Sequence, residues 1–396
     1  MSAQALLDDI ADVGRDRVRG GYSRHVFDAA DRELREWFAE QAQRRGLDVE
    51  RDRNGNLWAW WGTPGPDAVV TGSHLDSVPG GGAFDGPLGV VSALVAVDEL
   101  RGRGVTPAKP FAVVMFGEEE GGRFGVPCLG SRLLTGSLRA DAALRLRDAD
   151  GVTFAEAAVS AGLDPDRIGP DPEALGRIGR FVELHVEQGR GLIDLGSPIA
   201  VGSTVIAHGR WRFTFSGQGN HAGATPMDDR RDPMLPAAET IAAARRLARA
   251  VPGARATVGR LVPNPGGTNV IASTVDVWLD ARGGDVSSLV ADIEQAARVA
   301  AAEEGCSVQV RQESHSGEVE FDPGLRDELA GLLGGVPALP TGAGHDAAIL
   351  SDHVQAAMLY VRNPTGVSHA PEEFAEAADV AAGAGALARV LEHLCR

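Results

Sequence analysis

GSHLDSVPGGGAFDGPLG, residues 72–89, joins an expected strand to an expected helix and sets the fold class of the chain. The apolar residues 68–72 before it predict a strand, and the apolar residues 90–100 after it predict a buried helix. His74 stands where the strand ends, and Asp85 follows eleven positions later in a glycine-rich loop. Glycine lets a backbone turn tightly, so we expect these two side chains to approach one point.

Strands and helices alternate on both sides of this stretch. Further strands are expected from apolar segments at residues 56–61, 111–116 and 181–186. Residues 31–45 carry their apolar side chains at helical spacing. This order predicts an α/β domain with a mixed sheet and helices on both faces. Ligands of such sheets bind at the carboxyl ends of the strands, and His74, His185 and the run Glu118–Glu120 stand at or near such ends.

From residue 210 the pattern changes to that of an α+β unit. Its expected elements are a strand at 210–215, a helix at 234–251, strands at 255–262 and 274–281, a helix at 286–304 and a strand at 307–312. This β-α-β-β-α-β order is ferredoxin-like, and α/β character resumes after it. We therefore expect a catalytic α/β domain, residues 1–208 and 319–396, interrupted by an inserted α+β domain, residues 209–318.

The composition restricts the class of protein and its partners. The 396 residues are 43% hydrophobic and 23% charged, which is enough for two domains with their own cores. A formal net charge of −17 would repel nucleic acids and anionic membranes. No apolar run reaches the roughly 18–20 residues of a membrane span, the N-terminal residues lack a secretory signal, and the three cysteines form no disulfide framework. We expect a cytoplasmic protein that acts on a small molecule.

Imidazole and carboxylate side chains are the candidates for chemistry. The candidate metal ligands are His74, Asp85, Glu120, His185 and His369. Their nitrogen and oxygen atoms suit Zn²⁺ or Mn²⁺, and they could also bind Co²⁺ or Ni²⁺. The set contains no thiol, which argues against a structural cysteine-type zinc site. Each residue alone is a weak signal, because a single histidine at a strand end is usually packed or solvated, and a run of glutamates is usually a solvated turn.

Eight blocks of sequence together are far more specific. They are GSHLDSVPGGGAFDGPLG, EEEGGRFGVPCLGS, ELHVEQG, GNHAGATPM, TNVI, LDAR, GAGHDA and SHAPEE. With these blocks the chain resembles the M20 metallopeptidase-like amidohydrolases, in the branch of N-carbamoyl-L-amino-acid hydrolases, allantoate amidohydrolases and β-ureidopropionases. The blocks occur in the family's order. The resemblance implies a di-zinc peptidase-like catalytic domain with an inserted ferredoxin-like lid and dimerisation domain.

The resemblance implies two divalent metal ions, Zn²⁺ or Mn²⁺, bridged by Asp85. His74 and His185 would complete one metal site, and Glu120 and His369 would complete the other. A bound metal lowers the pKa of water to about 7, which makes hydroxide available at neutral pH.

Glu119 matches the general base of the family. It would take a proton from the metal-activated water and pass it to the leaving nitrogen. Neighbouring side chains on an extended segment point to opposite sides, so we expect Glu119 to face the water while Glu120 faces a metal.

The inserted domain would supply the substrate contacts. His221 matches the residue that stabilises the developing oxyanion, contributed across a homodimer interface. Asn269 and Arg282 match groups that bind the substrate's carboxylate, a task suited to the planar fork of arginine. Gln188 matches a group that contacts the ureido portion. We expect the inserted domain to close over bound substrate, and we interpret His345 in GAGHDA as supporting the ligands from behind.

These roles imply hydrolysis of the carbamoyl or ureido C–N bond of a small carboxylate substrate, with N-carbamoyl-L-amino acids and allantoate equally compatible. The first alternative is another M20 activity, that of a dipeptidase or an N-acyl-amino-acid deacylase. The second alternative is a small-molecule binding protein without catalysis, which an intact Glu119 beside five apparent ligands disfavours.

Overall fold

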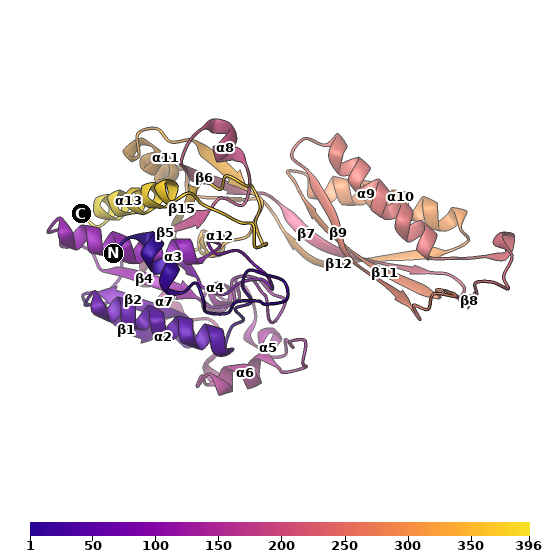
Figure 1. Ribbon diagram of the computed structural model, residues 1–396, viewed down its shortest axis with the longest axis horizontal. Helices are drawn as coiled ribbons and strands as arrows, with labels where there is room; N and C mark the ends of the chain where they lie inside the picture. Colours follow the sequence, from indigo (N-terminus) through magenta and orange to yellow (C-terminus); the bar gives the residue numbers. More distant parts are fainter. The chain divides into compact units, whose positions relative to one another are not determined.

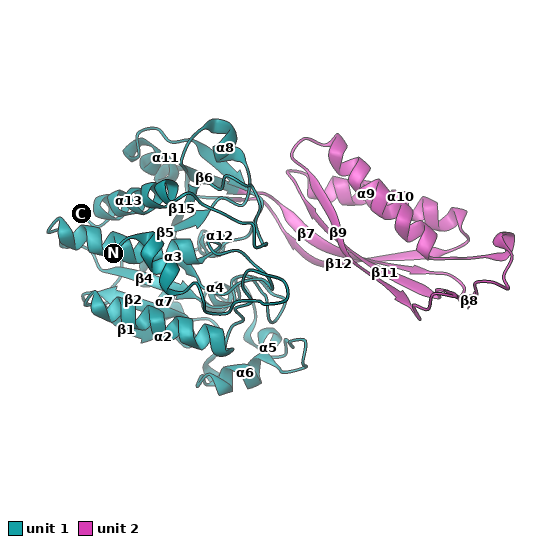
Figure 2. Cartoon of the chain, in the orientation of Figure 1, with its two compact units in different colours: residues 1–204, 320–396 teal, residues 205–319 magenta.

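The computed structural model describes residues 1–396, which divide into two compact units (Figures 1 and 2). Unit 1 comprises Met1–Thr204 and Glu320–Arg396, and unit 2 comprises Val205–Val319. The second unit is therefore an insertion into the chain of the first. No helix of the structure combines the length and the apolar character needed to cross a membrane.

Unit 1 is built on a nine-stranded sheet in the order β1-β2-β4-β3-β5-β15-β6-β13, with β14 paired to β6. The strands are β1 (Asp48–Arg51), β2 (Leu57–Trp61), β3 (Ala68–His74), β4 (Phe111–Phe116), β5 (Ile178–Val186), β6 (Ile199–Val205), β13 (Val319–Glu320), β14 (Ala338–Thr341) and β15 (Gln355–Val361). The central strands β4, β3, β5 and β15 run parallel, whereas β2 and β6 run antiparallel to β4 and β15. The sheet is thus mixed.

Helices cover both faces of this sheet (Figure 1). They are α1 (Ala3–Asp9), α2 (Ala29–Arg44), α3 (Pro87–Gly102), α4 (Leu129–Thr135), α5 (Ala140–Ala143), α6 (Phe154–Ser160), α7 (Pro172–Leu175), α8 (Gly191–Leu195), α11 (Pro323–Leu332), α12 (Asp346–Leu350) and α13 (Ala377–Leu394). Side chains of α1, α2, α3, α11 and α13 share one core with Val182, Leu184 and Val186 of β5. The alternate residues Glu183 and His185 face α12, whose backbone donates a hydrogen bond to Glu183 Oε2. The predicted α/β class is confirmed.

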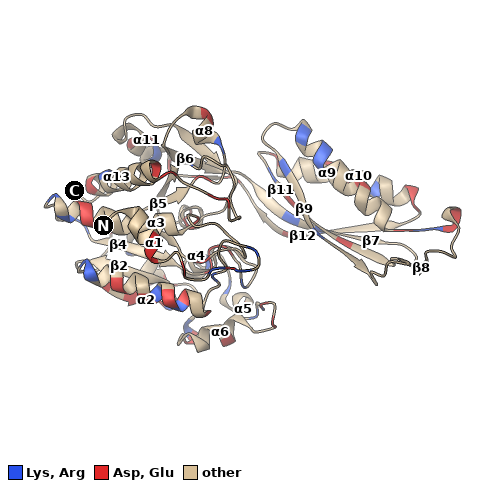
Figure 3. Ribbon diagram, viewed as in Figure 1, with Lys and Arg blue, Asp and Glu red and all other residues tan.

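Helix α2 shows how the apolar spacing selects a helix. Leu34, Phe38 and Ala42 are buried in the core, and charged residues of both signs are interspersed along the same helix (Figure 3). Asp28 caps the N-terminus by accepting a hydrogen bond from the backbone N–H of Asp31. The helix therefore begins two residues before the expected start at residue 31.

The loop between β3 and α3 brings the backbone against His74. Gly86 has φ of 82°, and a Cβ atom at this position would overlap the His74 ring. Only glycine tolerates both that conformation and that approach. Pro87 then begins α3, because its fixed φ suits the first turn of a helix.

Unit 2 has a four-stranded antiparallel sheet in the order β12-β7-β11-β9. Its elements are β7 (His208–Ser216), β8 (Asn220–His221), α9 (Met234–Ala250), β9 (Arg255–Asn264), β10 (Val270–Ile271), β11 (Thr274–Arg282), α10 (Val286–Glu303) and β12 (Ser307–Ser316). Every second residue of β11 is buried in a core shared with α9 and α10, which pack side by side (Figure 1). The chain order β7-α9-β9-β11-α10-β12 is ferredoxin-like, and β8 pairs with β10 outside this sheet.

Candidate metal centre

The parallel strands of unit 1 bring the candidate side chains to one edge of the sheet. β3 ends at His74, and β5 ends one residue after His185. The glutamates at 118–120 follow the end of β4, and His369 follows the end of β15. Because these strands are parallel, their carboxyl ends meet at the same edge.

His74, Asp85 and His185 form the first group of candidate ligands, with one donor atom of each within 4.8 Å of the others. Asp85 Oδ1 is 3.2 Å from His185 Nε2 and 3.7 Å from His74 Nε2. The second ring nitrogens contact backbone carbonyls: His74 Nδ1 is 3.0 Å from Asp76 O, and His185 Nδ1 is 2.9 Å from Val186 O. These carbonyls fix the rings so that both Nε2 atoms face Asp85.

Asp85, Glu120 and His369 form a second group within the same limit of 4.8 Å. Asp85 Oδ2 is 3.5 Å from His369 Nε2, which is itself 3.2 Å from Glu120 Oε2. Asp85 is buried, whereas His369 is exposed. The two carboxylate oxygens of Asp85 therefore face two different groups of ligands.

The donor atoms of these groups fit a divalent metal ion. Two buried atoms that could ligate a metal, His74 Nε2 and Glu120 Oε1, have no hydrogen-bond partner in the protein. Buried polar atoms are normally paired, so unpaired donors beside a shared carboxylate indicate a missing partner. Imidazole nitrogen and carboxylate oxygen are suitable ligands for zinc and manganese.

Burial and charge favour the ligand forms of His74 and Asp85 but hold a proton on His185, which a bound metal ion would displace. Burial lowers the pKa of His74 to about 4, so its ring is neutral at pH 7. Burial also opposes protonation of His185, but the hydrogen bond and the charge of Asp85 outweigh it and raise the pKa of His185 to about 9. Burial opposes ionisation of Asp85 too, yet the nearby His185 holds the pKa of Asp85 below its usual range. The carboxylate is thus already in the form that binds a metal.

Glu119 lies beside the first group of ligands. Its Oε2 is 3.6 Å from His74 Nε2, and its Oε1 accepts a hydrogen bond from Cys128 Sγ at 3.3 Å. Burial raises the pKa of Glu119 well above its usual value, and the charges of Asp346 and Glu120 raise it further. A carboxyl group with a raised pKa can accept a proton and hold it near neutral pH.

The segment that carries the glutamates is a bend, so the expectation of an extended segment was wrong. Glu118 has φ of 55°, in the left-handed region. The carboxylate of Asp76 holds the turned segment by accepting the N–H groups of Glu119 at 3.1 Å and Glu120 at 3.0 Å. This turn, rather than strand alternation, directs Glu119 and Glu120 to different groups. Asp76 was not among the predicted site residues, although it stands in the same block as His74.

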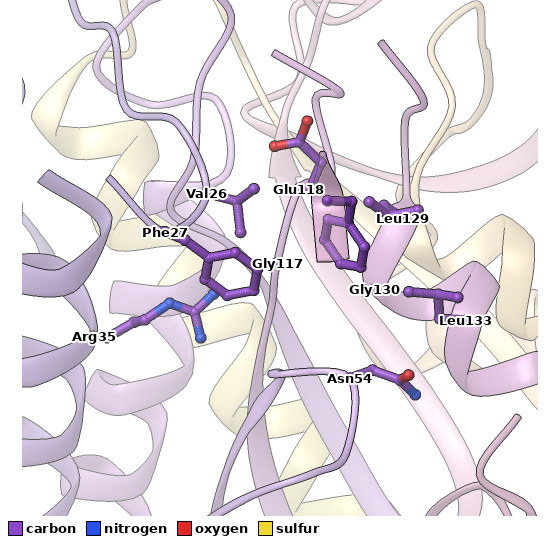
Figure 4. A pocket seen from close by; sticks show the side chains of 10 residues that line it. Val26, Phe27, Arg35, Asn54, Gly117, Glu118, Leu129, Gly130 and Leu133 are labelled. Carbon is purple, nitrogen blue, oxygen red and sulfur yellow. The ribbon is translucent and has the colours of Figure 1, made fainter. Parts of the chain in front are cut away.

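Glu118 points away from the candidate metal centre. Its Oε1 accepts the backbone N–H groups of Arg123 and Phe124 at 2.9 and 2.6 Å. Its side chain lines a separate cavity of ≈ 10 Å³ between α2 and α4, together with Phe27 and Arg35 (Figure 4). A cavity of this size holds about one water molecule, so it has no room for a substrate.

Gln188 reaches the candidate metal centre from just beyond the end of β5. Its Nε2 donates to Asp85 Oδ2 at 2.9 Å and to Ser368 Oγ at 3.2 Å. The amide oxygen Oε1 is buried and has no partner. It is therefore an acceptor that remains open beside the ligands.

His345 packs behind His185, with the two ring centroids 4.6 Å apart. It is 2% exposed, and neither of its ring nitrogens has a hydrogen-bond partner. His345, His185 and Glu183 form a third group of candidate ligand atoms within 4.8 Å. Glu183 is held by Ser73, whose hydroxyl donates to Oε1 at 2.8 Å. His345 thus belongs to the layer between β5 and α12.

In unit 2 the structure brings His221 close to Asn269. Strands β8 and β10 pair with His221 opposite Val270, the residue after Asn269. The carbonyl oxygen of Asn269 accepts the N–H of Ala222 at 3.0 Å. Both His221 and Asn269 are exposed.

Arg282 lies at the opposite end of the sheet of unit 2. It is the last residue of β11 and pairs with His208 at the start of β7, whereas Thr274 at the other end of β11 leads back to β10. At about 3.4 Å per residue, the ends of β11 are about 27 Å apart. Arg282 Nε donates to Asp280 Oδ1 at 2.8 Å. Arg282 and His221 of one chain therefore cannot both contact the same small molecule.

Comparison with known proteins gives consistent matches along the chain. The N-carbamoyl-L-amino acid amidohydrolase of Geobacillus stearothermophilus is 39% identical over 393 residues, which cover 96% of this chain and 95% of that protein. The allantoate amidohydrolase of Escherichia coli (strain K12) is 30% identical over 388 residues, which cover 95% and 93%.

Solved structures and a family match agree with these relatives. A crystal structure of an amidase of the hydantoinase/carbamoylase family from Burkholderia vietnamiensis superposes with a TM-score of 0.89 and 29% identity, covering 99% of this chain and 96% of that one. Residues 70–393 match peptidase family M20/M25/M40. The chain therefore belongs to the peptidase family M20/M25/M40, as its sequence blocks indicate.

Proposed function

We propose that this protein is a dinuclear-metal amidohydrolase that cleaves the carbamoyl C–N bond of an N-carbamoyl-L-amino acid. The observation that best supports this proposal is that the two carboxylate oxygens of Asp85 face two separate groups of candidate ligands. His74 and His185 would hold one ion and Glu120 and His369 the other. When bound, such ions polarise a carbonyl group and lower the pKa of water.

The relatives support a carbamoyl or ureido substrate. The relative at 39% identity is named for N-carbamoyl-L-amino acids, whereas the relative named for allantoate is 30% identical. This difference favours the carbamoyl substrate, with allantoate as the second candidate. Both substrates carry a carboxylate and a terminal ureido group.

Glu119 moves the proton in the proposed reaction. It accepts a proton from water as the water oxygen bonds to the carbamoyl carbon, and it passes that proton to the amino nitrogen when the C–N bond breaks. The products are the free amino acid and carbamate, which decomposes to ammonia and carbon dioxide. The open Oε1 of Gln188 supports a contact with the ureido N–H groups.

Two copies of the chain complete the proposed site. The ends of β11 are about 27 Å apart, and His221 lies near the end opposite Arg282. We propose that Arg282 binds the carboxylate of the substrate held by its own chain. His221 and Asn269 would come from the partner in a homodimer formed through unit 2. His221 would then stabilise the developing oxyanion.

Mixing two inactive variants tests this division of residues. Glu119→Gln and His221→Ala are each expected to be inactive as homodimers, because each lacks one part of every site. After subunit exchange, each mixed dimer regains one site with both residues, so about a quarter of the original activity should return. The measurement is ammonia release after mixing equal amounts of the two proteins.

The matched control is a mixture of Glu119→Gln with Arg282→Ala. If Arg282 acts within its own chain, no site in the mixed dimer has both Glu119 and Arg282, and no activity should return. Activity in this mixture, or no activity in the mixture of Glu119→Gln with His221→Ala, would contradict the proposed division of residues between the two chains.

A panel of substrates tests the reaction itself. The chain, reloaded with Mn²⁺ or Zn²⁺, is expected to release both a free amino acid and ammonia from N-carbamoyl-L-amino acids. The panel should also contain allantoate, N-carbamoyl-β-alanine, N-acetyl-amino acids and dipeptides. Ammonia and free amine are measured separately, because the bond that is cleaved decides which of them appears.

Each other result points to a different function. If ammonia were released only from allantoate, allantoate would be the substrate instead of an N-carbamoyl-L-amino acid. Free amine without ammonia would indicate a dipeptidase or a deacylase. No product from any compound would favour a binding protein without catalysis.

A further inference from the structure

Glu373 is a buried carboxylate next to the metal centre that the proposed reaction does not use. It is 4% exposed and lies four residues after His369, before α13 begins. Its Oε1 accepts the backbone N–H groups of Phe84 at 3.0 Å and Asp85 at 2.9 Å. One carboxylate oxygen thus holds the backbone of a candidate ligand that is distant in sequence.

The other oxygen of Glu373 holds the segment that carries His369. Its Oε2 accepts a hydrogen bond from Ser368 Oγ at 3.1 Å. Ser368 Oγ is also 3.1 Å from Asp85 Oδ2. The single hydroxyl proton of Ser368 can serve only one of these carboxylates at a time, so the contact links the two loops through a shared proton.

The loop before Asp85 is shaped around this carboxylate. A Cβ atom on Gly82 would collide with the carboxyl group of Glu373. The absence of a side chain at Gly82 therefore lets the loop 82–85 close over Glu373. Gln188 also links the two segments through its contacts with Asp85 Oδ2 and Ser368 Oγ, whereas Glu373 is the side chain that holds the backbone of the loop at Phe84 and Asp85.

We propose that Glu373 is a positioning residue for the metal centre. By joining the loop of Asp85 to the segment of His369, it sets the geometry of the group formed by Asp85, Glu120 and His369. This inference rests on the proposed function, because it requires that the group binds a metal. Groups that orient metal ligands typically contribute 10–100-fold in metal affinity.

Calorimetric titration of the chelator-treated protein with Mn²⁺ tests this role. Glu373→Ala removes all three hydrogen bonds and should weaken the binding of one ion by roughly 10–100-fold. Glu373→Gln should bind like the unaltered protein, because its amide oxygen can accept both N–H groups and its amide nitrogen can donate to Ser368. The matched control is Glu372→Gln, which changes the exposed neighbouring carboxylate and should have no effect.

Two results would overturn the inference: Mn²⁺ affinity in Glu373→Ala equal to that of the unaltered protein, or an equal loss in Glu373→Gln, which would indicate charge instead of position. If circular dichroism shows that Glu373→Ala is unfolded, the variant Gly82→Ala tests the role of Glu373 instead. Its added methyl group should displace the carboxylate and weaken binding similarly, and unchanged affinity would reject the role. Failure of the unaltered protein to bind either Mn²⁺ or Zn²⁺ would overturn the proposed function itself, and this inference with it.

Discussion

Glu119→Gln is expected to lower kcat by roughly 10²–10⁴-fold, the usual contribution of a general base, while the metal content stays unchanged. Glutamine keeps the size of the side chain and can still accept the hydrogen bond from Cys128. It cannot accept a proton from water, so the loss should fall on the chemical step. The measurements are kcat and KM with an N-carbamoyl-L-amino acid, and the metal content by elemental analysis.

The adjacent residue provides the control. Glu118→Gln changes the same chemical group one position earlier, but that side chain binds the backbone of Arg123 and Phe124 and lines the small separate cavity. Its kcat should stay close to that of the unaltered protein. An unchanged kcat in Glu119→Gln, or an equal loss in Glu118→Gln, would contradict the proposed role of Glu119.

Asp85→Ala is expected to remove metal from both ligand groups. Each group contains this carboxylate and only two other side chains, so each would retain two protein ligands, fewer than zinc sites usually have. The content of the metal-loaded protein should fall from about two ions to fewer than one per chain, with activity lost in parallel. Elemental analysis after gel filtration measures this directly.

Variants of ligands that belong to only one group serve as controls for Asp85→Ala. His74 belongs to the first group alone and His369 to the second alone. His74→Ala and His369→Ala should therefore each weaken mainly one ion. If Asp85→Ala lost no more metal than either histidine variant, Asp85 would not serve both groups.

Local pattern in the sequence was sufficient to predict the main elements of both units. The strand expected at 111–116 is β4 with the same bounds, because six consecutive apolar residues between turn residues are typical of a buried strand. Alternation in β11 and helical spacing in α9 and α10 likewise reflect burial on one face. Two-residue strands such as β8 and β13 have no detectable period, so only the folded chain reveals them.

The sequence also determined which residue types gather at the strand ends, through the blocks that carry His74, Asp85, His185 and His369. It could not determine how each is held. The turn at Glu118 is not visible in the pattern of residues. The hydrogen bonds of Asp76 to Glu119 and of Glu373 to Asp85 join residues 43 and 288 positions apart.

The separation of Arg282 from His221 was equally hidden, although both occupy recognisable blocks. Periodicity reports only whether a side chain faces the core, and motifs report only chemistry. Distances between segments that are remote in sequence depend on strand order, register and the path of the loops. For this protein the sequence by itself determined the family, the fold class and the candidate donors with their expected grouping around Asp85, and tertiary structure alone decided how these side chains are held and that Arg282 lies at the end of β11 away from His221.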